Sequence, residues 1–114
     1  MTFKMGERAF RDYLLTRDGT VLIVIDVQEK LFVKMEEKER IAQNICKLIR
    51  FADILKIPII ITEQYPKGLG PTIPEIRELT STVKPIEKVE FSCLAASAFR
   101  GKLAEIHARN LVLT

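Results

Sequence analysis

The chain has 114 residues, which suits one small domain with its own core and is short for two. Hydrophobic residues make up 47% and charged residues 29%, and the net charge is +3, as in many soluble globular proteins. Basic residues are interspersed with acidic ones and no apolar run approaches the thickness of a bilayer. The composition therefore favours neither a nucleic-acid partner nor a membrane span.

The first predicted elements are a short helix and a buried strand. Phe10, Tyr13 and Leu14 have the spacing of an amphipathic helix, which the Asp-Gly dipeptide at residues 18–19 ends with a turn. Residues 21–25 are apolar without interruption and rich in β-branched side chains. Such a run is typical of a strand that is buried on both faces of a parallel sheet.

The middle of the chain predicts a long helix, a second buried strand and a loop. Apolar residues recur at spacings of three and four over residues 36–56, which indicates a helix with one buried stripe. Residues 57–62 form a second apolar run, with Pro58 near its start, where no backbone donor is missed. A Pro- and Gly-rich loop follows, and Pro74 opens a short helix over residues 74–79.

The last part of the chain predicts a helix and a further strand. Residues 81–93 are mixed in character and are expected to be partly extended, residues 94–108 return to helical spacing, and residues 110–114 form a third apolar run. Alternating strands and helices predict a three-layer α/β/α, Rossmann-like fold with a parallel sheet. We expect residues 1–114 to form one domain with about three strands and, since no helix follows the last one, to be truncated at the C-terminal side.

Asp26 is the candidate functional residue of the first strand. It follows the apolar run directly, and ligands of open parallel sheets bind at the carboxyl ends of the strands. The next residues lack the glycines of a dinucleotide or phosphate loop, and Gln28 stands where a haloacid-type phosphotransferase usually has a second aspartate. A single carboxylate remains, suited to act as a base, to orient another group, or merely to cap the following turn.

Three sequence blocks resemble the isochorismatase-like cysteine hydrolases in their order and spacing. They are "VLIVIDVQEKLF", "PIIITEQYPKGLGPTIPEI" and "IEKVEFSC". The resemblance extends over residues 20–114, and it implies the isochorismatase-like type of α/β fold. The "TEQYPKGLGPT" block resembles most the branch of isochorismatase-domain proteins whose substrates are poorly defined.

The resemblance implies an Asp-Lys-Cys triad that hydrolyses an amide or a related C–N bond of a small molecule. Asp26 matches the aspartate of the family and Lys88 matches the lysine before the Phe-Ser pair, whereas Lys84 is out of register with that pair. The family cysteine follows the third predicted strand, so it is expected beyond Thr114. By this resemblance the chain is the N-terminal part of such a hydrolase, and we expect residues 1–114 alone to be inactive. In the triad, the carboxylate takes the thiol proton and the ammonium stabilises the thiolate.

Two alternatives remain open. Isochorismatases proper can hydrolyse a vinyl ether with the aspartate as acid, so Asp26 alone could serve. The chain could instead be a non-catalytic α/β module that pairs through its exposed edge strand, residues 110–114. The thiol of Cys93 is a possible substitute nucleophile, but a buried structural role is more common for such a cysteine.

The loops at the strand ends supply the remaining expectations. Phe32, Gln64 and Tyr65 are candidate substrate contacts, although Tyr65 could equally anchor its loop. No histidine follows "TEQYP", where nicotinamidase-like members carry metal-binding histidines, so we expect no catalytic metal and no cofactor. Two cysteines and one histidine are too few for a disulfide or zinc framework, which favours a cytoplasmic protein. As in the resembling family, we expect a homo-oligomer.

Overall fold

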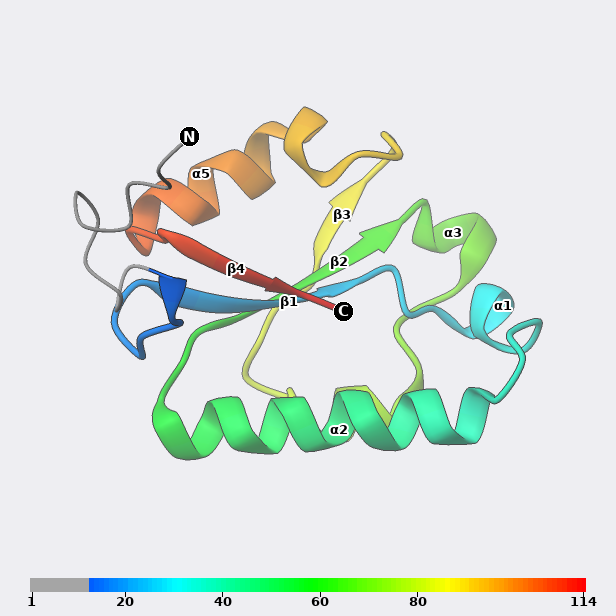
Figure 1. Ribbon diagram of the computed structural model, residues 1–114. Coiled ribbons are helices and arrows are strands. Elements are labelled where there is room, and N and C mark those ends of the chain that lie inside the picture. The colour runs from blue at the N-terminus through cyan, green and yellow to red at the C-terminus, as the bar shows by residue number, and fades with distance from the viewer. Residues whose placement is uncertain (1–12) are drawn as a thin grey trace, which may run out of the picture.

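The computed structural model describes residues 13–114, which form a parallel β-sheet between two helical layers. The sheet has the order β3-β2-β1-β4 and all three pairings are parallel. Figure 1 shows α2 along one face of the sheet and α5 along the other. The predicted α/β/α architecture is therefore confirmed. Of the predicted N-terminal helix, Phe10 lies outside the described residues, and Leu14 is exposed.

The strands lie close to their predicted positions. The bounds are β1 Thr20–Ile25, β2 Ile59–Gln64, β3 Ile86–Lys88 and β4 Asn110–Leu113. The sheet thus has four strands rather than about three, because the three residues of β3 pair with the end of β2. The strand predicted at residues 57–62 begins two residues later, at Ile59. Pro58 has no backbone N–H to donate, and its carbonyl accepts a hydrogen bond from the amide of Leu22.

The helices are α1 Glu29–Phe32, α2 Lys38–Leu55, α3 Pro66–Leu69, α4 Pro74–Leu79 and α5 Ser97–Glu105, with a 3-10 turn, η3, at Cys93–Ala95. The predicted helices over residues 36–56 and 74–79 are confirmed by α2 and α4. The predicted helix over residues 94–108 is divided into η3 and α5, and its last residues are not helical. No helix within residues 13–114 is long and apolar enough to cross a bilayer.

Each face of the sheet has its own hydrophobic cluster. Alternate residues of β1 and β2 pack against α2 and α4 on one face, with Ile49, Ile61 and Ile76 at the centre of the cluster. The other residues of the same strands pack against α5 on the second face, around Ile23 and Phe99. Continuous apolar runs are needed for this double burial, which is why β1 and β2 could be recognised from the sequence.

Candidate functional site

Asp26 directly follows β1 at the carboxyl edge of the sheet. Its backbone is in the left-handed region, with φ of 51°, a conformation that Asp and Asn adopt more readily than most other residues. Its amide donates to the carbonyl of Thr62 on the neighbouring strand at 3.1 Å. The chain therefore turns sharply out of the sheet at Asp26 while the residue stays fixed against β2.

Lys88 ends β3 at the same edge and reaches Asp26. Its Nζ donates to Oδ2 of Asp26 at 2.8 Å, to the carbonyl of Phe91 at 3.0 Å and to the carbonyl of Glu90 at 3.1 Å. The side chain of Lys88 is 0% exposed, whereas that of Asp26 is 15% exposed. All three protons of an ammonium are thus used. This geometry suits a fixed positive charge rather than a proton donor.

Thr62 completes the environment of the carboxylate. Its hydroxyl donates to Oδ1 of Asp26 at 2.8 Å, and the residue is fully buried. Among the hydrogen bonds within residues 13–114, each carboxylate oxygen of Asp26 accepts one, so each has a second lone pair that could accept another. Sequence reasoning missed Thr62, although a polar residue late in a buried strand, beside the strand of Asp26, was an available signal.

Cys93 lies next to Thr62. Its Sγ is 4.0 Å from Oγ1 of Thr62, and the residue packs against the cluster on the α5 face. No direct contact joins this thiol to Asp26 or Lys88 among the interactions found within residues 13–114. This placement agrees better with a packed thiol than with the nucleophile of the pair.

Gln28 and Glu63 fix the loop that follows β2. The side-chain Nε2 of Gln28 donates to the backbone carbonyls of Gln64 and Gly70, and its Oε1 accepts from the backbone amide of Gln64, all at 2.7–2.9 Å. Oε2 of Glu63 accepts from both the amide and the hydroxyl of Thr72 at 2.7 Å. Gln28 is fully buried and Glu63 nearly so. The two side chains therefore hold the loop against the carboxyl edge of the sheet.

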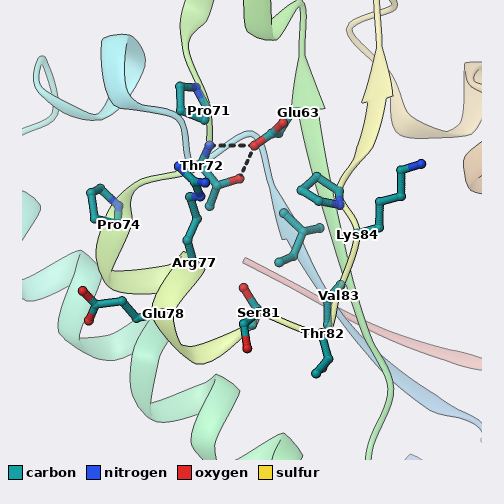
Figure 2. Close-up of a pocket in the computed structure, with 13 residues that line it drawn as sticks. Glu63, Pro71, Thr72, Pro74, Arg77, Glu78, Ser81, Thr82, Val83 and Lys84 are labelled. Atoms are coloured by element: carbon teal, nitrogen blue, oxygen red, sulfur yellow. Dashed lines mark hydrogen bonds between the residues drawn. The ribbon is translucent and has the colours of Figure 1, made fainter.

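Glu63 also lines a cavity of about 810 Å³ beside α4, on the face of the sheet away from Thr62. Figure 2 shows the carboxylate of Glu63 joined to Thr72, with Arg77, Ser81 and Lys84 around the same space. Neither Asp26 nor Lys88 lines it. The cavity is therefore distinct from the pair of Asp26 and Lys88.

The three predicted substrate contacts lie in different surroundings. Gln64 pairs in register with Lys88, and the amide of Tyr65 donates to the carbonyl of Lys88 at 2.9 Å, so both belong to the edge that carries the pair. Phe32 is buried in the cluster on the α2 face instead. The structure thus brings Asp26, Lys88, Gln64 and Tyr65 together and places Phe32 in the core.

The described residues form no metal site, and the thiol of Cys46 has a raised pKa. Within residues 13–114, no group of three or more His, Cys, Asp or Glu side chains is placed to bind a metal ion. Cys46 packs into the core on the α2 face. Burial raises the pKa of its thiol above the ordinary value of 9.0; Arg50 opposes this effect and Glu75 adds to it.

Comparison with known proteins identifies the family. The model of the Isochorismatase domain matches residues 20–114. The chain belongs to the isochorismatase-domain family. Isochorismatase domain-containing protein 2 of Danio rerio is 41% identical over 83 residues, and its human counterpart is 36% identical over 78 residues. These matches cover 73% and 68% of the chain but only 41% and 37% of the two relatives.

Solved structures show the same fold. A structure titled as the MAR1 ribonuclease of Caenorhabditis elegans matches with a TM-score of 0.78 and 33% identity, over 88% of this chain and 51% of that one. The YcaC gene product of Escherichia coli, described as an octameric hydrolase of unknown specificity, matches with a TM-score of 0.77 and 18% identity, over 90% and 52%. The second likeness concerns the fold alone. The chain therefore spans about half the length of both solved structures.

Proposed function

We propose that the chain carries the Asp-Lys part of an isochorismatase-like hydrolase that cleaves an amide or related C–N bond of a small molecule. The observation that carries the proposal is the hydrogen-bonded pair of Asp26 and Lys88 at the carboxyl edge of the sheet. Family membership supports a hydrolase, and the buried ammonium supports a role in holding negative charge.

In this proposal Asp26 is the general base. It keeps one free lone pair on each oxygen and is partly exposed, so it can take a proton from a nucleophile that approaches from the solvent side. Lys88 holds the carboxylate in place and stabilises the thiolate that forms. The nucleophile would be a cysteine beyond Thr114, as the resemblance implies, and residues 1–114 alone are expected to be inactive.

In the proposed reaction the thiolate attacks the amide carbonyl and forms a thioester as the amine leaves with a proton. Water then attacks the thioester and releases the carboxylic acid and the thiol. Asp26 takes the proton from the thiol and returns it to the leaving amine. Lys88 keeps its three hydrogen bonds throughout, because no step requires its proton.

Ribonuclease activity, which the similarity to the MAR1 ribonuclease of Caenorhabditis elegans suggests, is the less favoured activity for this chain. Binding RNA requires several cations that face the phosphates. Among the described residues around Asp26, the ammonium of Lys88 is fully buried and already saturated by three acceptors. A buried positive charge can instead stabilise the thiolate during cleavage of a C–N bond. We therefore favour C–N bond hydrolysis over RNA cleavage.

The test measures the release of ammonia from primary amides by the full-length protein, purified from its natural source. We expect Lys88→Ala to abolish release, because the base and the thiolate lose their cation. Lys84→Ala is the matched control, since Lys84 is an exposed lysine in the same segment that is not part of the pair, and it should retain the wild-type rate. Wild-type release by Lys88→Ala would rule out the proposal.

As in the expectation from sequence, we propose a homo-oligomer in the cytoplasm with a small-molecule substrate. The octameric state of the YcaC gene product supports the oligomer. Size-exclusion chromatography with light scattering would test it, and a monomer at micromolar concentration would contradict it.

A further inference from the structure

Glu63 is a buried carboxylate with one open oxygen. The residue is 7% exposed, and its Oε2 accepts hydrogen bonds from the amide and the hydroxyl of Thr72, both at 2.7 Å. Within residues 13–114, Oε1 accepts no hydrogen bond, yet no fully buried side-chain oxygen there lacks a partner. Oε1 of Glu63 is therefore accessible from the cavity beside α4, which Glu63 lines.

The carboxylate of Glu63 is held rigidly. Thr72 is fully buried, and its backbone forms an isolated β-bridge with Gln28. Two donors from this fixed residue meet on one oxygen of Glu63, so they also fix the direction of the other. Oε1 is thus a preorganised acceptor, which loses little freedom when a donor binds, and an ionised acceptor binds a cationic donor most strongly.

A second carboxylate lies beside Glu63. Glu87 of β3 pairs in register with Glu63 of β2, and register partners in a sheet place their side chains on the same face. The side chain of Glu87 is exposed. Because like charges on neighbouring strands repel each other, the two carboxylates favour a cationic group at Oε1 of Glu63.

Arg77 presents the opposite charge to the same cavity. Figure 2 shows its side chain extending from α4 toward Thr72, whereas the side chain of Lys84 extends away from Arg77. Among the described residues, the guanidinium of Arg77 has neither an ion pair nor a hydrogen bond, and so it is not joined to Glu63. An unpaired guanidinium is suited to bind a carboxylate through two parallel hydrogen bonds.

The size and the remaining lining of the cavity suit a small organic molecule. Its volume of about 810 Å³ lies in the usual range of ligand pockets. Besides the charged groups, apolar side chains line it, namely those of Ile61, Pro71, Pro74, Val83 and Pro85. A ligand that matches this lining has an ammonium, a carboxylate and an apolar part.

We propose that the cavity beside α4 binds an α-amino acid with an apolar side chain. Its ammonium donates to Oε1 of Glu63, its carboxylate accepts from the guanidinium of Arg77, and its side chain packs on the apolar lining. Neither Asp26 nor Lys88 lines this cavity, so the proposal is independent of the hydrolase proposal.

The test is isothermal titration calorimetry of the purified protein with three probes of one carbon skeleton. L-leucine has both charged groups, isoamylamine lacks the carboxylate and isocaproate lacks the ammonium. We expect L-leucine to bind at least about tenfold more tightly than either analogue, because only L-leucine pairs with both Glu63 and Arg77.

Two variants assign the contacts. Glu63→Gln keeps a carbonyl oxygen for Thr72 but replaces the open acceptor by an amide NH₂, so it should weaken L-leucine at least about tenfold. Arg77→Gln should weaken L-leucine about tenfold and leave isoamylamine unchanged. Glu75→Gln is the matched control, because Glu75 is an exposed carboxylate of α4 outside the cavity, and it should bind as the wild type does.

The fold of each variant is checked by far-ultraviolet circular dichroism. Arg77 is exposed and has no partner among the described residues, so Arg77→Gln should keep the fold. This variant therefore tests the proposal even if Glu63→Gln lowers the stability of the protein.

Three results would overturn the proposal. They are no binding of L-leucine, equal binding of L-leucine and its two analogues, and L-leucine binding that Glu63→Gln or Arg77→Gln leaves intact in a folded protein. None of these measurements requires turnover. Hence specific L-leucine binding together with wild-type ammonia release by Lys88→Ala would refute the hydrolase proposal and leave the amino-acid site standing.

Discussion

Nζ of Lys88 lies 2.8 Å from Oδ2 of Asp26, although 62 residues separate them in the sequence. The sheet order explains the meeting, because β1 and β3 are both neighbours of β2 and all three run in the same direction. Residues that end parallel strands share one edge. The fold thus brings residues of three separate sequence blocks, Asp26, Thr62 and Lys88, into one hydrogen-bonded group.

The first prediction concerns the stability of this pair. Asp26→Asn tolerates the left-handed backbone but leaves the buried ammonium of Lys88 without a counter-charge, so the free energy of unfolding should fall by about 2–3 kcal/mol. Arg40→Gln is the control, because its ion pair with Glu37 is largely exposed and should matter by less than about 0.5 kcal/mol. Urea denaturation measures both, and equal losses would contradict the prediction.

The second prediction concerns Thr62. Thr62→Val keeps the β-branched shape in β2 but removes the hydroxyl that donates to Oδ1 of Asp26. We expect a loss of about 1–2 kcal/mol, recovered largely in Thr62→Ser. The carboxyl carbon resonance of Asp26 should also shift in Thr62→Val and not in Thr62→Ser. If Thr62→Ser and Thr62→Val lost the same free energy of unfolding, the hydrogen bond to Asp26 would not contribute to stability.

The third prediction concerns the loop after β2. Gln28→Leu removes three buried hydrogen bonds and leaves backbone groups of Gln64 and Gly70 unpaired. The expected loss in the free energy of unfolding is about 3 kcal/mol. Gln43→Ala changes an exposed residue of α2 and should cost less than about 0.5 kcal/mol. Amide hydrogen exchange around Gly70 should become faster in Gln28→Leu and stay unchanged in Gln43→Ala. Equal exchange rates in the two variants would show that Gln28 does not hold the loop.

The fourth prediction compares two glycines. Gly19 has φ of +81°, and a Cβ there would meet Nε of Arg109 at 2.9 Å, so Gly19→Ala should destabilise by about 1–2 kcal/mol. Gly101 lies inside α5 with open space around it, and Gly101→Ala should stabilise by about 0.5–1 kcal/mol. Thermal denaturation should therefore give shifts of opposite sign.

The fifth prediction follows from Cys46. Burial raises the pKa of its thiol in the folded state, so the folded protein holds that proton more tightly than the unfolded chain does. This contribution to stability is complete below the unfolded pKa, near 9.0, and is lost as the pH rises through the folded pKa. Relative to Cys46→Ala, the wild type should lose stability above about pH 9. A constant difference between the two proteins from pH 7 to pH 10 would exclude the effect.

The elements with a regular pattern of apolar residues could be predicted from the sequence. β1 and α2 were recognisable because apolar residues repeat with the period of a doubly buried strand and of a one-sided helix. The edge strand β3 was harder, since only three residues pair and Glu87 between them is exposed. Its residues were expected to be partly extended, but they were not counted as a strand.

The site was predictable only in part for a related reason. Asp26 and Lys88 were found by position and by resemblance, and the structure places them in contact. Thr62 and Gln28 act through partners 36 residues away, so their roles depend on strand register rather than on any local pattern. Phe32 was predicted as a substrate contact because it follows the end of a strand, but it is buried in the core cluster on the α2 face of the sheet.

The most direct test of the central account is ammonia release from primary amides by the protein and by its Asp26→Asn variant. The intact mass of the same sample should be recorded, because 13.0 kDa corresponds to residues 1–114 alone. For a sample heavier than this, we predict release by the wild type and none by Asp26→Asn at matched folded concentration. Release by Asp26→Asn at the wild-type rate would contradict the assignment of Asp26 as the base.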